Sequence, residues 1–260
     1  MSLISYVNSI LNEDLSEIGL KRKKGLEWYK LIDNMFYVNV LVRKTGPILW
    51  VNVAVRSLLA PLEDSDMGMD EVDGMHWQSL LCEGKPDNQI FLEHLVYIEN
   101  DEGALQRMKT LGHRMIEPIK PVLLSVHDLQ SCYEAKNMLA YMMCRYSKSK
   151  SLGRDISPDE VTTWPPLDCF FILCKLGRYD DAADYIRREL ADYEQIHAED
   201  EILPILLEEE RGFWMPYVRM VENGEYDRIN EIMQKNYNEN CDLLEKKHKI
   251  KIDRNGFSCC

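Results

Sequence analysis

Four aspartates lie close together in one acidic stretch, and carboxylates at such spacing could bind calcium. They are Asp64, Asp66, Asp70 and Asp73. An EF-hand loop that began at the first of them would need Asp or Asn at its fifth position, glycine at its sixth and glutamate at its twelfth. The chain has Gly68, Met69 and Met75 at these places. The pattern therefore favours a solvated acidic loop over a calcium site.

The histidines could bind a metal ion or transfer protons. They are His76, His94, His113, His127, His197 and His248. None is spaced as H-x-x-x-H or H-E-x-x-H, the spacings that place two zinc ligands on one helix face. A meeting of His94, His113 and His127 with Cys132 in space is left open, but polar or core histidines are more common. The sequence predicts no metal and no cofactor.

Motifs for nucleophilic or phosphate chemistry are absent from the sequence. It contains no G-x-S-x-G, no G-x-x-x-x-G-K-[ST] and no G-x-G-x-x-G, which would mark a nucleophile elbow, a phosphate loop or a dinucleotide site. A cysteine–histidine pair stays open, because such partners are distant in sequence. Cys82 is the thiol with the most polar neighbours. No catalytic residue is assigned.

The eight cysteines indicate a reducing compartment. None forms a C-x-x-C pair, and scattered thiols without a framework spacing are typical of reduced intracellular proteins. The chain has no apolar run of about 20 residues that could span a membrane, and its first residues lack the basic segment of a secretory signal. We expect a cytoplasmic protein that does not bind membranes.

Charge is unevenly distributed along the chain, whose net charge is −13. Residues 1–57 and 104–150 are net basic, at +3 and +5, whereas 58–103 and 151–260 are net acidic, at −11 and −10. Such a balance argues against nucleic-acid binding through phosphates. The run KRKK at 21–24 could contact phosphate, but lysines also protect a strand edge from pairing. The acidic segments predict a basic protein partner.

Apolar residues predict a first helix and then an antiparallel sheet. Residues 3–15 have helical spacing, with Ser2 as the N-cap and Gly19 beyond the C-terminus. Residues 36–42 and 49–55 alternate β-branched and other residues around the turn KTGP. This pattern is typical of a β-hairpin.

One face of the predicted sheet is half polar and is the candidate binding surface. Its residues are Trp28, Tyr37, Asn39, Trp50, Asn52 and Arg56. A sheet face of this kind is either solvated or only partly covered.

From about residue 102 the apolar period changes from two to 3.6. This change predicts an α+β fold, with a helix and antiparallel sheet in 1–101 and an all-helical region of helical hairpins in 102–260. The polar segment 144–160 is the best candidate for an exposed loop.

A short pattern occurs twice in the helical region. KLGRYDDAADYI at 175–186 and ENGEYDRINEIM at 222–233 each have Gly, one residue, and Tyr-Asp before a helical pattern. We expect Gly177 and Gly224 to end one helix, and Tyr179 and Tyr226 to begin the next against the helix before it. The first copy resembles the turn of a tetratricopeptide hairpin. The spacing of 47 residues exceeds that family's period, so whether the pattern is a true repeat is left open.

The first sixty residues resemble a second family. A first helix, the run GLKRKKGLEWYKL at 19–31 and the strand WVNVAV at 50–55 are similar to a bacterial family catalogued as a domain of unknown function, number forty-three-oh-four. The resemblance implies a small, cytoplasmic, stand-alone bacterial protein. That family has no assigned activity, so the resemblance implies no role for any residue.

Two classes of function fit these observations. The first is a non-catalytic protein-interaction protein, in its most specific form an immunity-like or antitoxin-like protein whose acidic surface binds a basic partner. The second is an enzyme or small-ligand-binding protein with its site on the half-polar sheet face. The missing catalytic motifs, the helical hairpins and the acidic segments favour the first.

Overall fold

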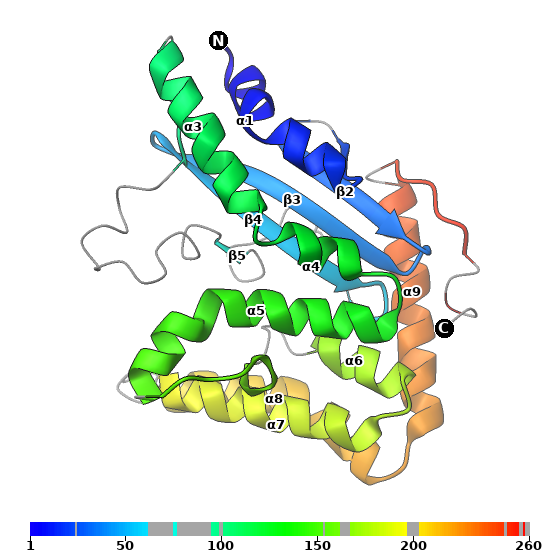
Figure 1. Cartoon of the computed structure of the whole chain (residues 1–260). Coiled ribbons are helices and arrows are strands. Elements are labelled where there is room, and N and C mark those ends of the chain that lie inside the picture. The colour runs from blue at the N-terminus through cyan, green and yellow to red at the C-terminus, as the bar shows by residue number, and fades with distance from the viewer. Residues whose placement is uncertain are drawn as a thin grey trace.

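The computed structural model describes residues 1–23, 25–61, 75–76, 95–98, 101–152, 154–161, 167–196, 203–246, 249–254 and 257. It has an antiparallel sheet with helices α1, α3 and α4 on one side and a helical layer, in which α5 to α8 lie at the other end of the molecule and α9 rises from them beside the sheet (Figure 1). The α+β fold with a helical C-terminal region is confirmed.

The sheet has the predicted hairpin at its centre. Its strands are β1 (Lys21–Arg22), β2 (Glu27–Ile32), β3 (Phe36–Thr45), β4 (Ile48–Ser57), β5 (Met75–His76) and β6 (Leu95–Val96). The order is β1-β2-β3-β4-β5, and β6 also pairs with β4. Thr45 pairs with Ile48 across the two-residue turn, where Gly46 has a φ of 58°. Because this region of φ is open to glycine without steric cost, Gly46 suits the turn.

Helix α1 (Leu3–Glu17) covers one face of the sheet. The side chain of Ser2 accepts a hydrogen bond from the backbone N–H of Ser5, and Gly19 follows with a φ of 79°, so both predicted caps are confirmed. The apolar stripe of α1 is buried, and the indole N–H of Trp28 donates to Asn12 Oδ1 at 3.1 Å. This face of the sheet belongs to the hydrophobic core.

Helix α3 (Glu102–Ile116) packs against α1, and α4 (Lys120–Ser125) follows it. The two longer helices approach closely at Gly112. A Cβ at this position would lie 2.4 Å from Ile10 Cγ2 and 3.1 Å from Leu11 Cδ2. The glycine therefore sets how near the two helices can come.

The helical layer consists of α5 (Leu129–Leu152), a short 3-10 turn η3 (Pro158–Glu160), α6 (Leu167–Lys175), α7 (Tyr179–Ile196), α8 (Leu203–Glu222) and α9 (Tyr226–Lys246). The predicted exposed loop at 144–160 is wrong for its first half, because α5 continues to Leu152. Serine and lysine cost little in a helix interior, and no proline interrupts this stretch. Residues 154–161 then fold back on α5, where Ile156 and Val161 pack against Ala140.

The two Gly-x-Tyr-Asp copies end and begin helices in the same way. Gly177 and Gly224 have φ values of 73° and 69°. In the first copy the N–H of Gly177 donates to the carbonyl of Cys174, and in the second the N–H of Gly224 donates to that of Val221. In each copy the next N–H donates to the carbonyl one residue further back, Arg178 to Leu173 and Glu225 to Met220, which is the Schellman arrangement. The predicted helical hairpins are confirmed, and the tetratricopeptide resemblance stays a prediction.

Helix α9 holds the chain where it leaves β4. The side-chain amide of Asn236 donates to the carbonyl of Leu59, and that of Asn240 donates to the carbonyls of Leu58 and Ala60. All three carbonyl residues are buried. Because buried carbonyls require partners, these two asparagines complete the hydrogen bonding of this segment.

One hydrophobic core contains residues from the sheet and from the helical layer. The C-terminal segment adds to this continuity, since Ile250 and Ile252 are buried and the N–H of Asp253 donates to Asn34 Oδ1 in the β2–β3 turn. The division into 1–101 and 102–260 stays a prediction.

Candidate functional site

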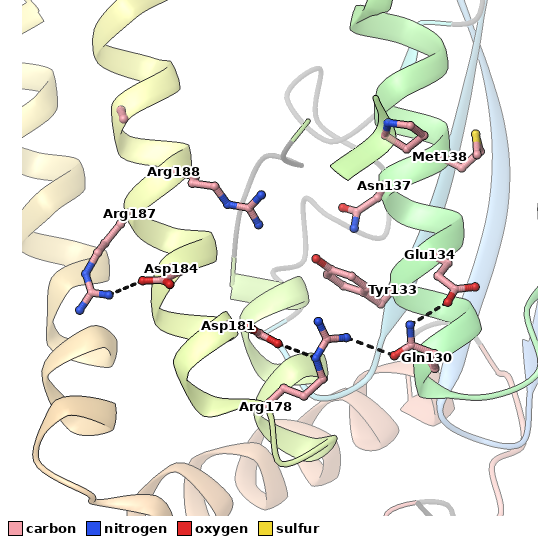
Figure 2. Close-up of a pocket in the computed structure, with 12 residues that line it drawn as sticks. Gln130, Tyr133, Glu134, Asn137, Met138, Arg178, Asp181, Asp184, Arg187 and Arg188 are labelled. Carbon is pink, nitrogen blue, oxygen red and sulfur yellow. Dashed lines mark hydrogen bonds and ion pairs between the residues drawn. The ribbon is translucent and has the colours of Figure 1, made fainter. Parts of the chain in front are cut away.

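A groove runs between α5 and α7 and encloses about 920 Å³ (Figure 2). We call it the α5–α7 groove. Its lining residues are Gln130, Tyr133, Glu134, Asn137 and Met138 of α5, Pro158 of η3, and Arg178, Asp181, Asp184, Arg187, Arg188 and Ala191 at the start and along α7.

The sequence of α7 explains why its polar side faces this groove. Ala182, Ala183, Ile186 and Leu190 are buried in the core. The charged residues between them, at intervals of three and four, lie on the opposite side of the helix. Residues 154–161 close over α5 and bring Pro158 to the groove.

Two tyrosines and one asparagine form a bonded unit along the groove. The hydroxyl of Tyr185 donates to Asn137 Oδ1 at 3.2 Å, and the rings of Tyr133 and Tyr185 lie 6.0 Å apart at 64°. Burial raises the pKa of Tyr133, and a hydrogen bond from Asn137 opposes the rise. The unit is fixed by both packing and hydrogen bonds.

Two arginines lie against these rings. The guanidinium of Arg178 is 5.6 Å from the ring of Tyr133, and that of Arg188 is 5.5 Å from the ring of Tyr185. Cation–π contacts of this length are attractive. Arg178 also donates to Asp181 at 2.7 Å and to Gln130 Oε1 at 3.3 Å.

Arg187, the neighbour of Arg188, has a different environment. It donates to Asp184 at 2.5 Å and to Glu222 of α8 at 2.7 Å. Figure 2 shows its guanidinium turned toward Asp184, while the guanidinium of Arg188 lies across the groove toward Asn137. Both arginines line the groove, but the guanidinium of Arg187 is turned toward carboxylates of α7 and α8.

Six residues were predicted from the sequence to share one sheet face, and the strand register places five of them together and one on the opposite face. Tyr37 pairs with Arg56, and Asn39, Trp50 and Asn52 follow at even spacing on the same face. Trp28 pairs with Val40, so it lies on the face covered by α1. The prediction that Trp28 belongs to the polar face was wrong, because the register of β2 against β3 places its side chain on the opposite face of the sheet.

The polar face of the sheet is buried rather than open. Asn39 and Asn52 are each 1% exposed, and Tyr37 and Arg56 are buried too. Asn39 Oδ1 and both polar atoms of the Asn52 side chain have no hydrogen-bond partner within the described ranges. The hydroxyl of Tyr37 donates a hydrogen bond to Glu27 Oε1 at 3.2 Å. Burial raises the pKa of Tyr37, and the negative charge of Glu27 raises it further. The prediction of a binding surface here stays a prediction.

A buried ion pair joins the sheet to the helical layer. Lys136 Nζ lies 2.7 Å from Asp168 Oδ2 and donates to the carbonyl of Val55. Asp168 also accepts from the backbone N–H and hydroxyl of Ser57. Burial is the largest single influence and lowers the pKa of Lys136, but the charge of Asp168, with smaller contributions from Cys169 and Cys132, leaves the pKa raised. Sequence reasoning missed this cluster, although an aspartate within PLDCFFILC is the signal that could have found it.

Helix α8 carries uncompensated acidic charge. Glu208 and Glu209 are exposed and Glu210 is partly buried. None of the three forms an ion pair with a described residue. Burial and then the charge of Glu209 raise the pKa of Glu210. Phe213, one turn further along α8, is 59% exposed. We call these four residues the α8 face.

The structure describes some of the other candidate residues from the sequence, namely part of the basic run and two of the histidines. Lys21 and Arg22 form β1 at an edge of the sheet, as the edge interpretation predicted. His113 bonds Asp14 at 2.7 Å, and His127 contacts the carbonyl of Ser125. His94, Cys82 and the acidic stretch around Asp64 lie outside the described residues.

Within the described ranges no group of three or more His, Cys, Asp or Glu side chains is placed to hold a metal ion. None of the described helices is both long and apolar enough to cross a bilayer. No protein-family model, no curated protein and no solved structure matches the chain.

Proposed function

We propose that the protein is a non-catalytic binding protein that docks a basic protein partner on its acidic helical half, as an immunity-like or antitoxin-like protein would. The α8 face carries the proposal. It combines three carboxylates with one exposed aromatic ring, and the carboxylates have no basic partner among the described residues.

The neighbouring acids show why this charge is unusual. Arg211 pairs with Glu194, Arg187 with Glu222, and Arg254 with both Asp242 and Glu245. Arg211, the next residue along α8, is therefore already paired with a carboxylate outside the α8 face. A basic partner would supply the missing positive charge.

Phe213 gives the α8 face an exposed aromatic anchor. An exposed aromatic residue that becomes buried often contributes a large share of binding energy, while surrounding charges set the association rate. The acids would attract the partner, and the ring would hold it after contact.

The test is capture of the partner at two salt concentrations. A pull-down with the full chain from its native host should retain a basic protein at low salt and lose most of it at about 0.5 M salt, where the Debye length falls to roughly 4 Å. The variant E208K/E209K/E210K should abolish capture. Retention of no basic protein at low salt contradicts the proposal.

A matched variant separates a local docking site from net charge. Asp227, Glu231 and Glu239 are exposed on α9, and D227K/E231K/E239K changes the net charge by the same amount. This variant should keep most of the capture. Equal loss in both triple variants would mean that the α8 face has no special role.

A second candidate function is small-ligand binding at the polar sheet face, and one observation favours it. Asn39 Oδ1 and both amide atoms of Asn52 are buried without partners in the described part of the chain, and each such atom costs about 1–3 kcal/mol unless something bonds it. If no ligand binds, N52L should raise the melting temperature of the purified protein. A lower melting temperature would support the ligand.

A further inference from the structure

We propose that the α5–α7 groove is a binding site for a neutral carbohydrate, a monosaccharide or a disaccharide. The proposal is independent of the α8 face. It rests on a tyrosine hydroxyl that is held in the groove as a donor without an acceptor, and on carboxylate oxygens around it that have no donor.

A chain of hydrogen bonds sets the direction of the Tyr133 hydroxyl. The hydroxyl of Tyr185 donates to Asn137 Oδ1, and the side-chain amide of Asn137 bonds the hydroxyl oxygen of Tyr133. Asn137 is only 5% exposed, so water does not disturb this chain. Because the oxygen of Tyr133 accepts a bond, its own proton points elsewhere. Figure 2 shows the hydroxyl directed into the space between α5 and α7, where no described residue accepts the proton.

The groove also offers acceptor atoms. Asp181 and Asp184 each bond an arginine through one oxygen, Oδ2 in the first and Oδ1 in the second. Glu134 accepts from Gln130 through Oε1. The other oxygen of each carboxylate has no donor among the described residues, and both oxygens of an ionised carboxylate can accept hydrogen bonds. Three acceptor atoms therefore remain for the hydroxyl groups of a ligand.

The charges of the lining favour a neutral ligand. Its charged members are Glu134, Asp181, Asp184, Arg178, Arg187 and Arg188. Three carboxylates and three guanidinium groups give a formal charge of zero, so an anion would meet the carboxylates and a cation would meet the guanidinium groups. Either contact is repulsive. A purely apolar ligand would instead leave the Tyr133 donor unpaired and shielded from water.

A carbohydrate matches the remaining groups. Each of its hydroxyls can both donate and accept, so neighbouring hydroxyls can accept from Tyr133 and donate to a carboxylate oxygen. Its C–H groups are apolar, and Met138, which is 36% exposed, and Pro158 supply apolar surface in the groove. The volume of about 920 Å³ lies within the range of roughly 300–1,000 Å³ that is usual for small-molecule sites.

The test uses the purified full chain and a panel of neutral sugars: glucose, galactose, ribose, maltose and trehalose. Each sugar is titrated separately, and binding is followed by isothermal calorimetry and by NMR shifts. At least one sugar should bind saturably, with the largest shifts at residues of the α5–α7 groove. The proposal is overturned if none of the panel binds up to tens of millimolar, or if the shifts lie on other surfaces.

Charged relatives of glucose test the neutral class. Glucuronate adds a carboxylate and glucosamine adds an amine, and both are titrated at the same ionic strength as the panel. Each should bind more weakly than the tightest neutral sugar, because the lining repels both signs of charge. Equal or tighter binding of either one contradicts a neutral ligand.

Variants of two tyrosines provide a matched pair. Y133F removes one hydroxyl and keeps the ring, so it should weaken binding about threefold to tenfold, the usual effect of one hydrogen bond. Y226F removes the hydroxyl of a tyrosine that is 40% exposed and lies outside the groove, so affinity should not change. D181N replaces a charged acceptor by an amide of the same shape and should weaken binding about tenfold or more. Equal affinity in Y133F and Y226F, or in D181N and the unaltered chain, contradicts the proposal.

Discussion

The ring of Tyr179 stacks on the ring of Tyr226, with centroids 4.0 Å apart and planes inclined at 25°. The two residues occupy the same position in the Gly-x-Tyr-Asp pattern, and each begins a helix. Equivalent positions thus meet face to face, so the beginnings of α7 and α9 are held together. The sequence led us to expect each tyrosine to pack against the preceding helix, and the structure adds a direct contact between the two rings.

This stack predicts coupling between the two tyrosines. Tyr226 is 40% exposed, so Y226A should cost about 1 kcal/mol, less than the ~3 kcal/mol typical of a fully buried aromatic. A double-mutant cycle with Y179A, measured by urea denaturation, should give a coupling of about 1 kcal/mol. Strict additivity would mean that the stack contributes nothing.

Two glycines inside helices predict opposite effects of the same substitution. Alanine in a helix interior is favoured over glycine by about 1 kcal/mol. G212A should show this gain in urea denaturation, because a Cβ there meets nothing within 4 Å. G112A should instead destabilise the protein by about 1–3 kcal/mol, since its Cβ would overlap Ile10 of α1. Stabilisation by both variants would show that α1 and α3 are less closely packed than described.

The pair of Lys136 and Asp168 predicts a strong asymmetry between single and double replacement. K136M leaves the carboxylate of Asp168 buried without its cation and should cost about 3–5 kcal/mol. K136M/D168L removes both charges and should recover a large part of that loss. Thermal unfolding of the three proteins provides the comparison, and a double variant less stable than K136M would contradict the argument.

The described thiols should be unreactive in the folded protein. Cys132, Cys169, Cys174 and Cys241 are buried thiols that are not in disulfides. Burial raises the pKa of the Cys174 thiol to about 12, and reaction requires the thiolate. At pH 8 a mild disulfide reagent should label these four only after denaturation. Cys259 and Cys260, which lie outside the described residues, should react first, and rapid native labelling of Cys174 would be inconsistent with its burial.

Glu160 should titrate at unusually low pH. A hydrogen bond from Arg154, followed by one from the N–H of Ser157, lowers the pKa of Glu160 to about 2. Because the folded pKa lies below the ordinary value of 4.5, the contact stabilises this segment above that pH and is lost as the pH falls toward 2. NMR titration should show this value, and R154Q should move it up toward 4.5. An unchanged pKa of Glu160 in R154Q would show that Arg154 does not cause the low value.

The sequence predicted the features that depend on local pattern. The hairpin, the caps at Ser2 and Gly19, and the helix ends at Gly177 and Gly224 each follow from a few neighbouring residues. Side-chain orientation was predicted less well, as Trp28 shows, because a one-residue change of register reverses a strand's faces. The length of α5 was underestimated, since its last two turns lack the apolar period.

The α5–α7 groove and the pair of Lys136 and Asp168 were beyond sequence reasoning for a different reason. Tyr133 and Tyr185 are 52 residues apart in the sequence, and nothing local indicates that α5 and α7 face each other. Sites built from two helices depend on packing, which only the folded chain reveals.

The asparagines of α9 also determine when folding can finish. They bond carbonyls 177 to 182 residues earlier in the chain, so β4 leaves the ribosome long before its final partners are made. Until α9 is made, these carbonyls lack the two amide donors that bond them in the folded protein. The last stage of folding therefore waits until α9 has been made, and contacts of such long sequence separation make it slow.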